Sequence, residues 1–180
     1  MVIDGDGWLQ PAPGIQHRPS PNHDDRPDGL AIDLLVIHNI SLPPGVFIGD
    51  AIIDFFQNRL DHDAHPWFDN IRDLRVSAHF LIRRDGQIVQ FVATTQRAWH
   101  AGVSSFQGRE RCNDFSIGIE LEGTDVIPYT QVQYERLNLL AAAIRARHPV
   151  CWVQGHEHIA PGRKTDPGPA FDWTRLRGWD

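Results

Sequence analysis

Two histidines and one aspartate, far apart in the chain, have the side-chain types of a single metal site. His38 ends a short apolar run, His156 follows far downstream, and Asp166 comes shortly after it. If the three side chains converge, they supply two neutral imidazoles and one carboxylate, the ligand set of a catalytic Zn²⁺ that keeps its fourth position open for water. The chemistry that such an ion supports is hydrolysis.

His38 is singled out by what precedes it. Residues 34–37 read Leu-Leu-Val-Ile, a continuous apolar run that is typical of a strand buried on both faces. An imidazole at the end of such a strand costs roughly 1–3 kcal/mol if it is buried without a partner. His38 is therefore either a ligand or a core histidine that is satisfied by a hydrogen bond, and the pattern fits both.

Two choices within the predicted site stay open at this point. His156 and His158 are two residues apart, and on an extended chain their imidazoles would point the same way. The same parity puts Glu120 and Glu122 on one polar face of the strand at residues 116–123, where one carboxylate is expected to be functional. Spacing therefore selects neither the second histidine nor the acidic group.

Five of the other histidines and the two cysteines are predicted to carry no chemistry. Cys112 and Cys151 are expected to be free thiols, with Cys151 in a buried strand and Cys112 in a polar loop. Five histidines lie in polar or terminal contexts and are expected on the solvated surface: His17, His23, His62, His65 and His148.

The elements that must position these residues follow from periodicity and turn signals. Helical spacing is expected over residues 50–58 and 66–74, and Asp85-Gly86 predicts a hairpin with a primed turn between residues 76–84 and 87–92. A capping box at Thr130 and Gln133 opens a long helix to about residue 147. A strand at residues 151–154 and a final short helix capped by Asp172 complete the order.

This order predicts an α/β fold with one mixed β-sheet flanked by helices. The 180 residues fit a single domain, residues 1–180, in which the proline-rich residues 1–30 form an extended wrap anchored by Trp8 and Ile15. The net charge of −6 argues against nucleic-acid or anionic-membrane partners. No apolar run approaches the roughly 20 residues of a membrane span, and no export signal opens the chain, so we expect a cytoplasmic protein without an obligate protein partner.

Five motifs, in order, carry a resemblance to a known family. The chain resembles the N-acetylmuramoyl-L-alanine amidases and peptidoglycan recognition proteins, and among them the 1,6-anhydro-N-acetylmuramyl-L-alanine amidases of bacterial cell-wall recycling, from about Trp8 to Trp173. The motifs are VIHNISLPPG at 36–45, RVSAHFLI at 75–82, RAWHAG at 97–102, NDFSIGIELEG at 113–123 and RKTDPG at 163–168.

The resemblance implies a role for each residue of the site. It implies Zn²⁺ at His38, His156 and Asp166, with Glu120 as the acid/base residue and Lys164 stabilising negative charge. The implied substrate is a small anhydro-muropeptide, cleaved between the lactyl group of the sugar and L-alanine. Five residues are candidates for holding it, because guanidinium groups pair with carboxylates and Trp offers a flat face to a sugar: Asn39, Arg75, Trp99, His100 and Arg111. The alternative is a non-catalytic muropeptide sensor.

Overall fold

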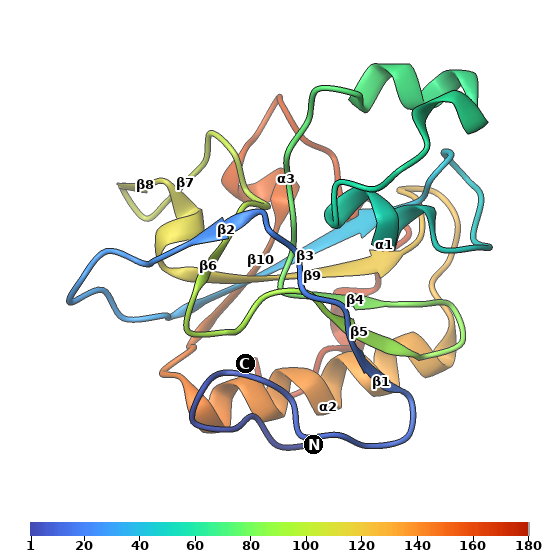
Figure 1. Cartoon of the computed structure of the whole chain (residues 1–180). Coiled ribbons are helices and arrows are strands. Elements are labelled where there is room, and N and C mark those ends of the chain that lie inside the picture. The colour runs from blue at the N-terminus through green and yellow to red at the C-terminus, as the bar shows by residue number, and fades with distance from the viewer. Residues whose placement is uncertain (180) are drawn as a thin grey trace.

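A computed structural model describes residues 1–179 and confirms the α/β architecture (Figure 1). Asp180, which the single-domain prediction includes, lies outside the described residues. The strands are β1 Ile15–His17, β2 His23–Asp24, β3 Leu34–Ile40, β4 Phe80–Ile82, β5 Ile88–Gln90, β6 Arg97–Ala98, β7 Ser105–Phe106, β8 Arg109–Glu110, β9 Ser116–Glu122 and β10 Trp152–Gly155. The helices are α1 Ala51–Phe56, α2 Gln131–Arg147 and α3 His156–Ile159, with 3-10 turns η1 His62–Ala64, η2 Pro66–Ile71, η3 Cys112–Asp114 and η4 Trp173–Arg175.

The central sheet is mixed, as expected, and has the strand order β1-β5-β4-β9-β3-β10. Only the β4–β5 hairpin is antiparallel, and the other neighbouring strands in this sheet run parallel. β3 and β9 are its longest strands and lie next to each other, with His38 opposite Glu120 in the register. Burial on both faces of the sheet explains the continuous apolar run that begins β3.

The two faces of the sheet are covered by different helices (Figure 1). Leu35 and Ile37 of β3 face α2, whose predicted stripe of Tyr134, Leu137, Leu140, Ala141 and Ile144 is buried in the same cluster. On the opposite face, Leu34 and Val36 pack against Ala101 and Ile159, and α1 covers Leu81 and Val89. Because side chains alternate along a strand, His38 belongs to the face opposite α2.

The N-terminal segment is more regular than an extended wrap. Its β1 pairs in parallel with β5 and forms one edge of the central sheet, with Ile15 packed against the α2 side of the core. The Trp8 ring packs at a tilt against His17, with ring centroids 5.1 Å apart, and Trp8 is half-buried. Ile3 and Leu9 are buried in the core and add to the anchoring of this segment.

The hairpin is confirmed, but its primed turn is wrong. The N–H of Arg83 donates to the Gln87 carbonyl and the N–H of Gly86 donates to the Arg83 carbonyl, each at 2.9 Å. Of the two central residues of the predicted turn, Gly86 has a positive φ, of 84°, and Asp85 does not. The chain therefore turns over residues 83–86, and glycine supplies the single left-handed residue that this connection needs.

Three expectations about burial are reversed. Cys151 precedes the edge strand β10 and is exposed, whereas Cys112 is fully buried in η3; both are free thiols. His148 is buried at the end of α2, with Nε2 2.8 Å from Oγ1 of Thr94. Within residues 1–179, no helix is long and apolar enough to cross a membrane.

Candidate metal centre

The three predicted ligands converge at the end of β3. Nδ1 of His38 lies 3.0 Å from Nδ1 of His156 and 3.0 Å from Oδ2 of Asp166, and the remaining distance, from His156 Nδ1 to Asp166 Oδ2, is 3.1 Å. His38 and His156 are buried and Asp166 is partly buried. The three atoms therefore form a nearly equilateral triangle that opens toward the pocket described below.

The size of the triangle and the types of its atoms are compatible with a divalent cation. Ligands about 2.05 Å from a tetrahedral Zn²⁺ stand about 3.3 Å apart, close to the separations observed here. Burial lowers the pKa of His38 to about 4, so its imidazole is neutral, the form that binds a metal. Burial raises the pKa of Asp166, but the contacts of its carboxylate with the imidazoles of His156 and His38 outweigh burial and hold that pKa below its usual range.

The outer nitrogen of each imidazole is also held. Nε2 of His156 lies 3.1 Å from the carbonyl oxygen of Ala101, so that nitrogen carries the proton and Nδ1 presents its lone pair to the triangle. Nε2 of His38 lies 2.9 Å from Nδ1 of His100. Such outer contacts fix the tautomer and orientation of a ligating histidine.

Glu120 stands beside this triangle, and Glu122 does not. Glu120 is 9% exposed, and within residues 1–179 its Oε2 has no hydrogen-bond partner. Burial raises its pKa well above the usual range and the nearby charge of Asp166 adds to that, whereas Lys164 lowers it. Glu122 instead accepts a hydrogen bond from the Arg84 N–H at 2.9 Å, so the two carboxylates that the sequence left equivalent have different surroundings.

A pocket of about 230 Å³ opens over the triangle and contains part of the predicted site. Its lining includes the three candidate ligands together with Glu120, Lys164, Asn39, Trp99 and His100. Asn39 also has partners of its own, because its Nδ2 donates to Asp125 at 2.8 Å and to the Pro167 carbonyl at 3.1 Å. These contacts hold the segment that carries Asp166.

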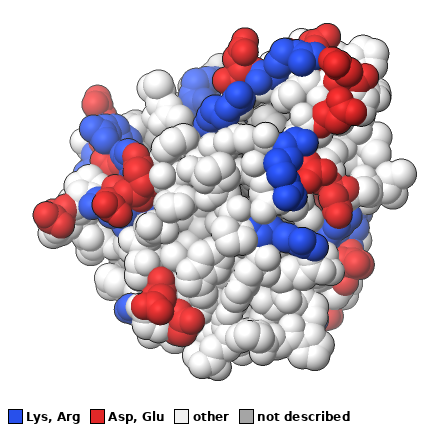
Figure 2. Space-filling view, in the orientation of Figure 1, with Lys and Arg blue, Asp and Glu red and all other residues white. Residues whose placement is uncertain are grey.

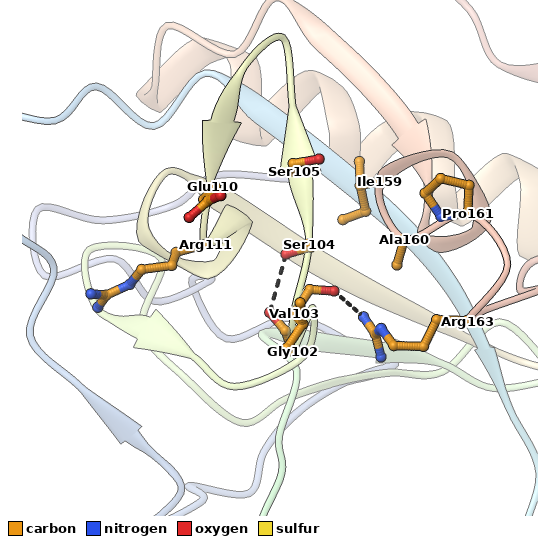
Figure 3. A pocket seen from close by; sticks show the side chains of 10 residues that line it. All are labelled: Gly102, Val103, Ser104, Ser105, Glu110, Arg111, Ile159, Ala160, Pro161 and Arg163. Carbon is orange, nitrogen blue, oxygen red and sulfur yellow. Dashed lines mark hydrogen bonds between the residues drawn. The ribbon is translucent and has the colours of Figure 1, made fainter.

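Arg75 and Arg111 are not brought to this pocket. Arg75 is exposed and its guanidinium donates to the carbonyls of Arg72 and Leu74. Arg111 lines a second hollow of about 580 Å³, and Figure 3 shows its side chain extending away from Arg163 on the other side of that hollow. Substrate contact by these two arginines stays a prediction.

Arg163 and the Ala101 carbonyl were missed by sequence reasoning. The Arg163 guanidinium donates to the carbonyl of Ala101 at 2.7 Å. It also donates to the carbonyl of Val103 at 2.6 Å, as Figure 3 shows. It therefore braces the carbonyl that holds His156. A backbone carbonyl leaves no mark in a sequence, although Arg163 belongs to the same short motif as Lys164 and Asp166.

Comparisons with known proteins place this geometry in a family. The family model described as N-acetylmuramoyl-L-alanine amidase matches residues 28–169. The chain belongs to the N-acetylmuramoyl-L-alanine amidase family. It is 58% identical over 179 residues to the 1,6-anhydro-N-acetylmuramyl-L-alanine amidase AmpD of Citrobacter freundii, covering 98% of this chain and 94% of that relative.

Solved structures agree with this membership. A crystal structure of a selenomethionine derivative of AmpD has a TM-score of 0.93 at 57% identity and covers 98% of both chains. The amidase AmiD of Escherichia coli, solved with the substrate anhydro-N-acetylmuramic acid-L-Ala-D-gamma-Glu-L-Lys, has a TM-score of 0.58 at 32% identity, covering 84% of this chain and 59% of that one. The predictions of the family, the fold class and an enzyme are confirmed.

The surface of this amidase carries charges of both signs. On the face shown in Figure 2, Lys and Arg side chains lie beside Asp and Glu side chains in groups along the margin, around a broad area of other residues.

Replacing His158 by Ala is expected to leave the metal content of the amidase unchanged, whereas His156→Ala should reduce it. His158 is 43% exposed, and its Nδ1 accepts a hydrogen bond from the Gly155 N–H at 2.9 Å, away from the triangle. Elemental analysis of both variants after dialysis measures the difference. Metal loss in His158→Ala with full retention in His156→Ala would reverse the choice of ligand.

Proposed function

We propose that this amidase uses Zn²⁺ to hydrolyse the amide bond between the lactyl group of 1,6-anhydro-N-acetylmuramic acid and the L-alanine of the stem peptide. Its role would be the recycling of cell-wall fragments in the cytoplasm, with a small anhydro-muropeptide as substrate. The observation that carries the proposal is the convergence of His38, His156 and Asp166 beside the buried Glu120, whose Oε2 has no hydrogen-bond partner within residues 1–179.

Similarity supports the choice of substrate. The AmpD relative is named for the 1,6-anhydro-N-acetylmuramyl-L-alanine bond and shares 58% of its residues over nearly the whole chain. The AmiD structure holds an anhydro-muropeptide, and AmiD has the same fold at 32% identity. Identity at the level of the AmpD relative makes the same scissile bond the best assignment for this chain.

The donor set supports zinc. Two imidazoles and one carboxylate form a mixed nitrogen and oxygen set of three, which matches catalytic zinc sites that keep one position open, whereas structural zinc sites are closed by four protein ligands. When bound, Zn²⁺ polarises the scissile carbonyl and lowers the pKa of a coordinated water toward about 7. His38, His156 and Asp166 are the residues that would hold it.

The chain's own residues account for the proton transfers. Glu120 takes a proton from the attacking water and delivers it to the leaving nitrogen of L-alanine, a role for which a buried carboxylate with a free oxygen is suited. Lys164, exposed at the edge of the pocket, faces the negative charge that develops on the carbonyl oxygen. Trp99 offers a flat surface in the same pocket against which a sugar ring can pack.

A cleavage assay tests the proposal. The purified protein is treated with a chelator and then assayed with and without added Zn²⁺. The substrates are an anhydro-muropeptide and the same muropeptide carrying a reduced sugar, and the products are identified by mass spectrometry. We expect release of the intact stem peptide from the anhydro substrate only when metal is present. Cleavage at another bond, or equal turnover after chelation, would contradict the proposal.

A further inference from the structure

Two consecutive residues hold the outer nitrogens of both candidate metal ligands. Nδ1 of His100 lies 2.9 Å from Nε2 of His38, and the carbonyl of Ala101 lies 3.1 Å from Nε2 of His156. Both residues are fixed in turn by Asn113, whose Oδ1 accepts hydrogen bonds from the His100 N–H at 3.1 Å and the Ala101 N–H at 2.8 Å. Residues 100 and 101 therefore form a short brace behind the metal centre.

The hydrogen bonds through His100 have one consistent direction. With the Nδ1 lone pair of His38 facing the triangle, the proton of His38 is on Nε2 and is donated to Nδ1 of His100. His100 then carries its own proton on Nε2, which lies 3.2 Å from Oγ of Ser116. In each of these two neutral imidazoles, one ring nitrogen donates a hydrogen bond and the other accepts an interaction. No hydrogen bond in the series therefore needs a proton on both of its nitrogen atoms.

β9 is shaped to seat the His100 ring. A Cβ at Gly118 would lie 2.5 Å from Cγ of His100 and 2.6 Å from its Nδ1, closer than side chains can approach. Gly118 faces the same side of the sheet as Ser116 and Glu120, because side chains alternate along the strand. A glycine at this position lets the imidazole rest on the strand, edge-on to His38 with the two ring planes at 84°.

We propose that His100 is a positioning residue that holds His38 in its metal-binding orientation, and that Ser116 and Gly118 fix the His100 ring for this purpose. This assigns His100 a different role from the substrate contact expected from the sequence. The inference rests on the proposed metal centre. Loss of an outer hydrogen bond of this kind typically weakens metal binding by about 10- to 100-fold.

Two substitutions of His100 separate hydrogen bonding from packing. His100→Leu fills much of the space but has no acceptor, whereas His100→Asn places its Oδ1 near the position of Nδ1. The measurement is the affinity of the full-length protein for Zn²⁺ in competition with a chromogenic chelator. We expect His100→Leu to bind Zn²⁺ about 10- to 100-fold more weakly and His100→Asn to recover most of that loss.

Further variants and a control keep the result interpretable. Ser116→Ala, a small change that should fold, is expected to weaken Zn²⁺ binding several-fold, and Gly118→Ala should do so by displacing the ring. His17→Leu removes an exposed imidazole on β1 and should bind Zn²⁺ as the unmodified protein does. Urea unfolding of the metal-free variants shows whether any loss of affinity merely follows a loss of stability.

The outcomes distinguish this inference from the proposed function. If the unmodified protein binds no Zn²⁺, the metal centre itself fails. If it binds tightly and both His100→Leu and Ser116→Ala bind equally well, only the role of His100 is overturned. Equal losses in His100→Leu and His100→Asn would also overturn it, because packing of the ring, and not its acceptor nitrogen, would then be what matters.

Discussion

Glu120→Gln is expected to lower kcat by about 10²- to 10⁴-fold while Zn²⁺ stays bound. Gln keeps the size of the side chain but cannot accept a proton from water, and Glu120 is the buried carboxylate beside the triangle with a free oxygen. Turnover of an anhydro-muropeptide by mass spectrometry, together with elemental analysis, measures both quantities. Glu122→Gln is the matched control, because Glu122 lies on the same strand and can keep its hydrogen bond from Arg84 as Gln.

The raised pKa of Glu120 predicts how pH affects the turnover and the stability of the unmodified protein, and a comparison with Glu120→Gln checks both. Burial raises the pKa of Glu120, so the ionised form that accepts a proton is lost as the pH falls through that raised value. For folding, a carboxyl whose pKa is higher in the folded than in the unfolded protein contributes stability below its unfolded pKa and loses it as the pH rises through the folded pKa. Metal-free Glu120→Gln should therefore resist urea better than the unmodified protein at neutral pH. Unchanged turnover with metal bound would remove Glu120 from its proposed role.

Asp166→Ala is expected to weaken Zn²⁺ binding by more than the about 10- to 100-fold that follows the loss of a residue hydrogen-bonded to a metal ligand. At limiting Zn²⁺ concentration the variant should show no turnover. Asp166 supplies the single carboxylate of the triangle, at 3.0 Å from His38 Nδ1 and 3.1 Å from His156 Nδ1. Its removal leaves two imidazoles, too few for a catalytic site. Dialysis followed by elemental analysis and the cleavage assay measure the effect.

Chelation of the unmodified protein should reproduce this loss reversibly. Added Zn²⁺ should restore turnover to the chelated protein but only partly to Asp166→Ala. Asp69→Ala serves as the control, since Asp69 pairs with Arg72 on the exposed surface, where an ion pair contributes little. Full metal occupancy and normal turnover in Asp166→Ala would mean that another residue completes the site.

The sequence predicts most of the fold because its clearest patterns are local ones, which determine whether a segment forms a strand or a helix. The apolar run before His38 and the alternation through Glu120 correspond to β3 and β9, and the capping box at Thr130 opens α2 with both of its hydrogen bonds present. A helix is predicted over residues 66–74, and the 3-10 turn η2 covers Pro66–Ile71 of them. Pro66 suits the start of this turn because no backbone N–H is needed there. Local rules of this kind need no knowledge of distant contacts.

The site depends on long-range contacts, which the alternation of side chains along a strand cannot predict. Glu120 and Glu122 share a face of β9, but only Glu120 is opposite His38, whereas Glu122 reaches the hairpin. His156 and His158 would align on a strand, yet both lie in the short helix α3 and diverge there. Cys112 is buried because the turn η3 packs against Leu34 and Val36 of β3, a long-range contact that its polar neighbours in the sequence do not reveal.

One feature of the topology bears on the motions of the protein. His38 belongs to the interior strand β3, while His156 and Asp166 come from the segment that follows the edge strand β10. An ion shared among them would act as a cross-link between the middle of the sheet and the C-terminal part of the chain. A ligand that binds only the folded form stabilises it by about 4 kcal/mol when its free concentration is a thousand times its dissociation constant. Fraying of the C-terminal segment would then be suppressed while the ion is bound, and the rate at which metal exchanges with solution would follow the local opening of that segment.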